Sequence, residues 1–110
     1  MAIIIKTNTP ADLLAAIKKE IKEGKIETWS CDSDGDFTHT PEQWKYDAWL
    51  RPKIYGGELR FGILKNKNIG MSTVIYGIYH GRFIEMLLSH FDDKFTNVYA
   101  TAQKAEPDNF

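Results

Sequence analysis

The stretch from Ser72 to Phe91, STVIYGIYHGRFIEMLLSHF, is the longest apolar-periodic run in the chain and constrains the fold more than any other feature. On a helix, with about 100° between successive residues, the run divides into two faces. The apolar face carries Ile75, Tyr76, Tyr79, Phe83, Met86, Leu87, His90 and Phe91, and the polar face carries Arg82, Glu85, Ser89 and Asp92. This pattern predicts one amphipathic helix that begins after Ser72, whose hydroxyl can cap the first turn.

A strand over residues 71–80 is the alternative for the first half of this run, because residues 74–79 are rich in β-branched and aromatic side chains. The helical phase continues unbroken from Ile75 to Phe91, which favours a helix throughout. Gly77 and Gly81 share one side of it, and we expect close packing against a neighbouring element there. Docking of a partner's backbone on this side is the second interpretation.

Before this helix, the sequence indicates a strand, a helix and two hairpins. Residues 2–6 include three consecutive isoleucines, which is typical of a strand buried on both faces. A helix is predicted next, with Thr9 as its N-cap, Pro10 in its first turn and Gly24 as its left-handed stop. The first hairpin is predicted to pair residues 26–33 with 36–40 around Asp34-Gly35, and the second to pair residues 48–55 with 58–64 around Gly56-Gly57. Residues 41–46 predict one helical turn, and residues 96–102 predict a final strand.

The second hairpin alternates between apolar and polar residues, so its two faces can be assigned. The core face is predicted to carry Ala48, Leu50, Ile54, Leu59, Phe61 and Ile63, and the outer face Trp49, Arg51, Lys53, Tyr55, Glu58 and Arg60. Pro52 cannot donate a hydrogen bond to a neighbouring strand, so we expect it at a sheet edge or at a bulge.

These elements predict an α+β fold, with one mixed or antiparallel sheet of about six strands and two helices on one face. The predicted order is strand, helix, four strands, helix, strand. A single domain over residues 1–103 is expected, and its core should contain Leu13, Ile17, Ile21, Phe83 and Leu87. Residues 104–110 carry no core signal and are expected to form a flexible tail.

Composition narrows the class of protein. The formal net charge of −1 gives no global field that attracts nucleic acid or an anionic membrane. Cys31 is the single cysteine, which favours a reducing compartment. The apolar run at the start is too short for a signal peptide, and no segment has transmembrane length without a charge or a breaker. We therefore expect a cytoplasmic protein that makes no membrane contact.

Three aspartates around the first turn, Asp32, Asp34 and Asp36, superficially resemble a calcium loop. An EF-hand needs glycine at position six and glutamate at position twelve, and Phe37 and Gln43 stand there instead. The histidines do not cluster with other ligands, and no phosphate-binding loop is present. We expect no metal site and no cofactor.

A Cys31–His39 catalytic pair is excluded if the turn has two residues, because Cys31 then faces Thr38 and His39 faces Ser30, on opposite faces of the hairpin. The same register puts Ser30, Asp32 and His39 on one face, which we interpret as a polar sheet face without catalysis. With no catalytic motif, a non-enzymatic function is favoured.

The outer face of the second hairpin is the predicted binding surface, with Trp49, Arg51, Lys53, Tyr55 and Arg60. Such a surface can anchor a protein partner or stack bases. A solvated face on which the cations stack on the aromatic rings is the structural alternative.

The expected function is that of a small protein-interaction or regulatory domain, monomeric or homodimeric, whose partner is another protein. One alternative is a small-molecule-binding protein or enzyme, with a pocket between the 72–91 helix and the sheet, lined by Trp29, Tyr79, His80 and Arg82. Another is a single-strand nucleic-acid binder that uses the 48–64 hairpin face, which the net charge disfavours.

Overall fold

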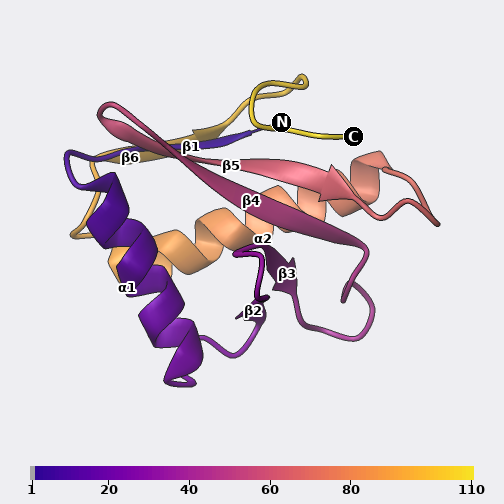
Figure 1. Ribbon diagram of the computed structural model, residues 1–110, viewed down its shortest axis with the longest axis horizontal. Coiled ribbons are helices and arrows are strands. Elements are labelled where there is room, and N and C mark those ends of the chain that lie inside the picture. Colours follow the sequence, from indigo (N-terminus) through magenta and orange to yellow (C-terminus); the bar gives the residue numbers. More distant parts are fainter. Residues whose placement is uncertain (1) are drawn as a thin grey trace.

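Within residues 2–110, six antiparallel strands form one sheet, and the two helices lie on the same side of it (Figure 1). The computed structural model describes residues 2–110. In chain order the elements are β1 (Ile3–Lys6), α1 (Pro10–Lys22), β2 (Trp29–Cys31), β3 (Phe37–His39), β4 (Ala48–Tyr55), β5 (Glu58–Lys65), α2 (Thr73–Phe91) and β6 (Asn97–Ala100). The predicted α+β class and the predicted order of elements are confirmed.

The sheet order is β2-β3-β4-β5-β1-β6, so β1 lies between β5 and β6. This position explains the three isoleucines of β1, all of which are buried. Ile3 and Ile5 belong to the main core under the helices. Ile4 points to the other face, between its cross-strand partners Arg60 and Tyr99.

Helix α2 spans the whole of the predicted run, so the alternative of a strand over residues 71–80 is wrong for residues 73–80. The Ser72 hydroxyl accepts a hydrogen bond from the N–H of Ile75 at 3.2 Å, as expected of an N-cap. His90, predicted on the apolar face, is instead exposed, with Nδ1 3.6 Å from the Glu20 carboxylate. A Cβ atom added at Gly77 or Gly81 would meet no atom within 4 Å, so the prediction of close packing there is wrong.

The core lies between the sheet and the two helices. Leu13 and Ile17 of α1 and Phe83 and Leu87 of α2 are buried in it, and Ile21 is partly buried against it. Five of the six predicted core positions on the second hairpin are fully buried: Ala48, Leu50, Leu59, Phe61 and Ile63.

The prediction is wrong for the sixth core position of that hairpin, Ile54, which is 48% exposed. Its cross-strand partner Leu59 is buried, because β1 continues the sheet beyond β5. The described residues place no strand beyond β4 at the level of Ile54.

The first hairpin has a different register from the predicted one. Trp29 pairs with His39, Ser30 with Thr38 and Cys31 with Phe37. The turn is one residue wider than predicted, because the Asp32 carboxylate accepts hydrogen bonds from two backbone N–H groups across it. Gly35 has a φ of 85° in this turn, which glycine adopts without strain. Consequently Cys31 and His39 share a face and Ser30 lies on the other, the reverse of the prediction.

Strand β3 pairs with β4 at Phe37 and Leu50, and the Thr38 hydroxyl bonds the Ala48 carbonyl, so the part of β4 that follows Leu50 has an open edge. Pro52 lies in this open part, which confirms its predicted place at an edge. The backbone of Ile63 bonds to the C-terminal segment, away from β4. By the alternation of an antiparallel ladder, Pro52 then turns its nitrogen to the open side, away from its partner Phe61.

Residues 41–46 form turns and not the predicted helical turn. One helical hydrogen bond does form, from Lys45 N–H to the Pro41 carbonyl at 3.0 Å, and Tyr46 then adopts a φ of 63°. The Trp44 side chain packs against the core, and its carbonyl accepts a hydrogen bond from the Tyr79 hydroxyl.

Residues 104–110, expected to be a flexible tail, lie beside β5 and donate a 2.8 Å hydrogen bond from Asn109 N–H to the Ile63 carbonyl. Their mobility stays a prediction. Within residues 2–110, neither helix is long and apolar enough to cross a membrane.

Candidate functional site

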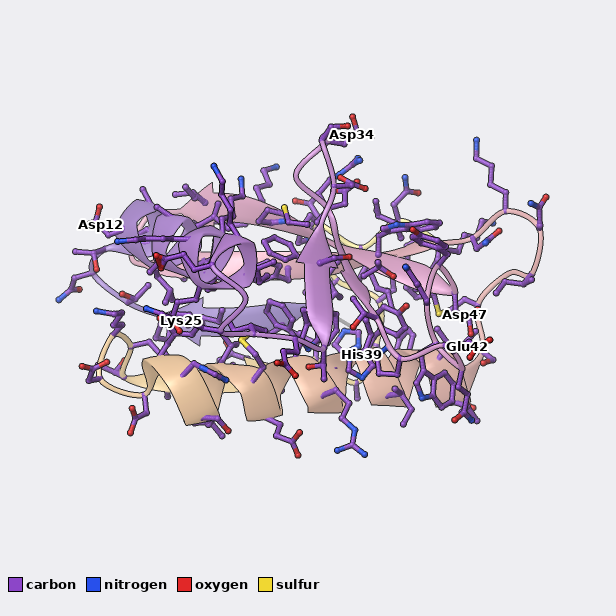
Figure 2. The ribbon with its side chains drawn as sticks, turned by 90° about the horizontal axis from the view of Figure 1, so that it is seen from below. Asp12, Lys25, Asp34, His39, Glu42 and Asp47 are labelled. Carbon is purple, nitrogen blue, oxygen red and sulfur yellow. The ribbon has the colours of Figure 1, made fainter. Side chains whose placement is uncertain are left out.

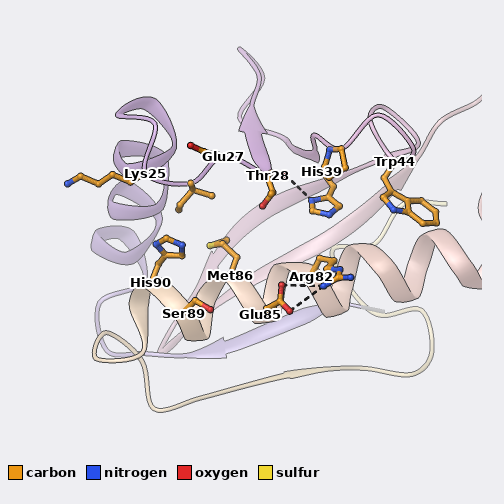
Figure 3. A pocket seen from close by; sticks show the side chains of 12 residues that line it. Lys25, Glu27, Thr28, His39, Trp44, Arg82, Glu85, Met86, Ser89 and His90 are labelled. Carbon is orange, nitrogen blue, oxygen red and sulfur yellow. Dashed lines mark hydrogen bonds and ion pairs between the residues drawn. The ribbon is translucent and has the colours of Figure 1, made fainter.

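An open cleft of about 530 Å³ lies between α2 and the chain around β2 and β3 (Figure 3). The segment between α1 and β2, with the end of β3 and the residues after it, forms one wall, and α2 forms the other. Its polar lining comes from Lys25, Glu27, Thr28, His39, Arg82, Glu85, Ser89 and His90, and its apolar lining from Ile26, Pro41, Trp44 and Met86. The cleft therefore offers several hydrogen-bonding groups beside an aromatic ring and a thioether.

His39 is the most buried polar group of this lining, with 5% of the residue exposed. Its Nδ1 lies 2.8 Å from the Thr28 carbonyl, which can only accept, so Nδ1 carries the proton. The lone pair is then on Nε2, and no residue in the described range 2–110 donates a hydrogen bond to it. Burial lowers the pKa of His39, more than the Thr28 bond raises it, which keeps the imidazole neutral.

The imidazole is held in place from several sides. The Trp29 ring lies 4.5 Å from it, centroid to centroid, as expected of a direct cross-strand partner. The Tyr79 ring meets it edge-on at 6.2 Å. Backbone bonds fasten the end of β3, because Thr40 N–H donates to the Thr28 carbonyl at 2.8 Å. His39 is thus a fixed acceptor and not a mobile surface side chain.

Arg82 and Glu85 face His39 from α2, and Figure 3 shows the imidazole pointing towards Arg82. The charge of Arg82 lowers the pKa of His39 and the charge of Glu85 raises it, after the larger effects of burial and the Thr28 bond. Their mutual ion pair is long, at 3.3 Å, and both side chains are more than half exposed. Such a pair contributes little to stability, so both charges can turn to a ligand.

A shallow hollow of about 260 Å³ extends the cleft along α2. Gly77 and Gly81 line it together with Ile78, and Arg82 and Glu85 line both depressions. The open space above the two glycines is therefore continuous with the wall of the cleft.

The predicted alternative pocket is placed differently by the structure. Trp29 and Tyr79 are core residues behind His39, with 2% and 0% exposed. His80 is also buried and hydrogen-bonds the Tyr76 carbonyl through Nδ1 at 2.7 Å. Arg82 alone of the four lines the cleft. Sequence reasoning missed His39, which a three-residue turn would have placed opposite Trp29.

The predicted binding face of the second hairpin has most of its charges paired within the fold. Arg51 donates two hydrogen bonds, of 2.8 and 2.7 Å, to the buried Asp36 carboxylate. Arg60 binds Glu58 at 2.8 Å. Among residues 2–110, Lys53 is the one predicted cation of this face that has no acidic partner.

The aromatic residues of this face are also engaged. Lys53 and Arg60 lie over the Tyr55 ring, at 5.4 and 4.6 Å from its centroid. The Tyr55 hydroxyl is buried and has no hydrogen-bond partner within the described part of the chain. Trp49 is half-buried and stacks on Tyr46 at 6.4 Å. These contacts resemble the structural alternative to a binding surface, in which the cations of the face stack on its aromatic rings.

A third depression, of about 500 Å³, lies where this face meets the first hairpin, and Trp49 and Arg51 line it with the three aspartates. One potential ligand atom from each aspartate falls within 4.8 Å of the others. The Asp32 carboxylate already closes the turn, Asp36 is bound to Arg51, and Asp34 stands at the exposed tip (Figure 2). These bonds account for the cluster as an acidic turn, and the absence of a metal stays a prediction.

Cys31 and His39 share a face, but their polar atoms have different partners. The Cys31 thiol lies 3.7 Å from the Asp32 carbonyl, and burial raises its pKa, which disfavours the thiolate. His39 is bonded to Thr28. The described contacts therefore do not assemble an activated thiol.

Comparisons of the chain with protein-family models, with curated proteins and with solved structures find no match.

Proposed function

We propose that the protein binds a small polar molecule in the cleft between α2 and the β2–β3 hairpin. The observation that carries this proposal is the His39 imidazole, buried, fixed by Thr28 and left with an unbonded Nε2 at the cleft. The residue is buried, but its Nε2 atom opens onto the cleft, so a ligand that donates a hydrogen bond to this fixed acceptor displaces only water.

The other lining groups define the class of ligand. A ligand acid would pair with Arg82, and a ligand amine or amide would pair with Glu85, since these two side chains are only loosely paired with each other. Trp44 and Met86 offer an apolar surface beside them. The proposed ligand is therefore a small molecule that carries both an acidic group and an N–H donor, on a compact apolar body.

We propose binding and not catalysis. A neutral imidazole can act as a base, but the described contacts place no activated nucleophile beside His39. The cleft is also open, whereas catalytic sites gain much of their electrostatic effect from excluding water.

The proposal is tested by nuclear magnetic resonance titration of the full chain with free amino acids and small carboxylic acids at millimolar concentrations. The Nε2 resonance of His39 should move with at least one class of probe. His39→Phe, which keeps a ring against Trp29 but removes the acceptor, should weaken binding at least tenfold. Lys53→Ala, on the hairpin face and outside the cleft, is the control and should change binding less than twofold.

The proposal fails if no probe moves the Nε2 resonance. It fails equally if a probe that does so binds His39→Phe as tightly as it binds the original chain.

A protein partner at the second hairpin is a second candidate function. The observation that favours it is the aromatic pair formed by Trp49 and Tyr46, because Tyr46 is 55% exposed while stacked on Trp49. Exposed aromatic groups are typical anchors of protein interfaces. Trp49→Ala should then abolish capture of the partner while the melting temperature stays within a few degrees. A variant that melts normally and keeps every partner would contradict this role.

Nucleic acid is a less suitable partner for the same face, because Arg51 and Arg60 are held by Asp36 and Glu58. We also propose a cytoplasmic location, supported by the single unpaired thiol of Cys31. Reaction of intact cells with a membrane-impermeant thiol reagent, followed by unfolding and mass measurement, should leave Cys31 unmodified, whereas the same reagent applied after lysis should modify it.

A further inference from the structure

The edge of β5 is open beyond the end of β1. Strand β1 pairs with β5 from Glu58 to Phe61 only, so the residues that follow have no strand on that side. The C-terminal segment, residues 105–110, occupies this position and forms a parallel bridge between Asn109 and Leu64. An exposed strand edge of this kind is the usual place for an added extended peptide.

Asn109 pairs with the edge as an added parallel strand would, after a turn in which Asp108 N–H donates to the Ala105 carbonyl at 2.8 Å. Asn109 N–H donates to the Ile63 carbonyl at 2.8 Å, and Lys65 N–H donates to the Asn109 carbonyl at 3.3 Å. Ile63 N–H donates to the Asp108 carboxylate at 2.8 Å. The other oxygen of Asp108 accepts from Ala105 N–H at 2.9 Å, so this one carboxylate both shapes the segment and binds it to β5.

Gly62 has no Cβ atom, and the segment packs directly against its backbone. A Cβ atom at this position would lie 2.3 Å from the carbonyl carbon of Pro107, which is far inside contact distance. The residue is buried, and the chain uses no positive φ there, so close approach is the reason for glycine. A side chain at position 62 therefore collides with the backbone of the segment at Pro107 and Asp108.

An aromatic contact completes the site. The Phe110 ring meets the Tyr76 ring of α2 edge-on at 5.4 Å and packs against the main core. Tyr76 itself is 7% exposed, so the ring of Phe110 covers an otherwise open part of the core. The segment thus presents three features to the site: proline over Gly62, an aspartate to Ile63 N–H, and an aromatic ring to Tyr76.

We infer that the β5 edge from Gly62 to Lys65, together with Tyr76, is a peptide-binding site that the chain's own residues 105–110 occupy. Its partner is a peptide with the pattern proline, aspartate, any residue, aromatic residue, which turns at the proline and pairs with β5 after the aspartate. The segment is joined to the site by a short link, so it competes with a free peptide at an effective concentration in the millimolar range. A partner peptide binds when the segment leaves the edge.

The test uses full-length variants and a synthetic peptide of residues 104–110 with both ends blocked, titrated by nuclear magnetic resonance up to several millimolar. Phe110→Ala loosens the chain's own segment and leaves the site intact, so it should bind the peptide at least tenfold more tightly than the original chain does. Asp108→Ala should do the same by a different route, which guards against one variant failing to fold.

The matched control is the double variant Gly62→Ala with Phe110→Ala, in which the Cβ blocks Pro107 of any peptide. It should lose at least tenfold in affinity relative to Phe110→Ala. The inference is overturned if folded Phe110→Ala and Asp108→Ala bind the peptide no better than the original chain does. It is also overturned if the double variant binds the peptide as tightly as Phe110→Ala does.

Discussion

The cleft beside α2 and the outer face of the β4–β5 hairpin are both rich in charged side chains, yet they hold those side chains differently. On the hairpin face, Arg51 donates two short hydrogen bonds to the buried Asp36 carboxylate, and Arg60 forms an ion pair with Glu58. In the cleft, Arg82 and Glu85 are exposed and only loosely paired. The cleft also contains the Nε2 atom of His39, which opens onto it and has no partner in the described chain.

This difference shows why charge and aromatic content alone are a poor guide to a binding surface. A ligand that takes Arg51 from Asp36 must replace two good hydrogen bonds, so its net gain is small. A ligand that bonds His39 replaces only water. The polar groups of the hairpin face are therefore engaged in bonds within the fold, whereas those of the cleft are available to the proposed ligand.

The largest expected effect on the free energy of unfolding comes from a substitution in the hydrophobic core, which underlies both surfaces. Leu87 of α2 is fully buried in the core, so Leu87→Ala should lower the free energy of unfolding by about 2–5 kcal/mol. Denaturant unfolding followed by circular dichroism measures it. A loss below about 1 kcal/mol would mean that α2 is not packed as described.

A matched pair of substitutions separates the two surfaces by stability. Arg51→Met leaves the Asp36 carboxylate, whose side chain is only 7% exposed, without its two donors, and should cost about 1–3 kcal/mol. Arg82→Met in the cleft removes an exposed partner and should change stability by less than about 0.5 kcal/mol. Equal losses in thermal or chemical unfolding would contradict the comparison.

Acidification should act on the cleft through His39. Its pKa in the folded state is lowered, mainly by burial, so the unfolded chain takes up a proton first as the pH falls. Stability should therefore fall as the pH drops below the ordinary histidine value of about 6.5, until the folded-state pKa is passed. His39→Phe should lose less stability than the original chain between pH 7 and pH 5. Parallel curves of the free energy of unfolding against pH for the two chains would show that His39 does not cause the loss.

The smallest effect is expected from Lys53→Ala. Lys53 is exposed and has no acidic partner among residues 2–110, although it lies over the Tyr55 ring. Its removal should change the free energy of unfolding by less than about 0.5 kcal/mol. Arg60→Ala is the control on the same ring and should cost more, because Glu58 loses its closest cation.

Local patterns in the sequence predicted most of the fold. The apolar period of α2 and the alternation along β4 and β5 are properties of neighbouring residues, and both helices and the long hairpin were found from them. Ile54 was misplaced because its exposure depends on the short β3 strand, which leaves the edge of β4 uncovered.

The candidate site was less predictable, because it depends on contacts between distant segments. A hydrogen bond to the Asp32 side chain sets the width of the first turn. The resulting shift of one residue in register places His39 opposite Trp29, on the same face of the hairpin. The docking of residues 105–110 on β5 uses backbone bonds and a missing Cβ, which leave no apolar pattern in the sequence. The place of His39 in a cleft follows only from the position of α2 opposite it, which no local pattern of residues predicts.

Pro52 has a consequence for behaviour at high concentration. Strand β4 is uncovered along its outer half, and such an edge is a template on which a second molecule can add a strand and begin to aggregate. At Pro52 the side that faces outward has no N–H to offer, and the neighbouring Lys53 adds an exposed charge. An approaching strand finds an interrupted ladder of hydrogen bonds and an exposed cation there, and both disfavour growth of the open edge into a larger sheet.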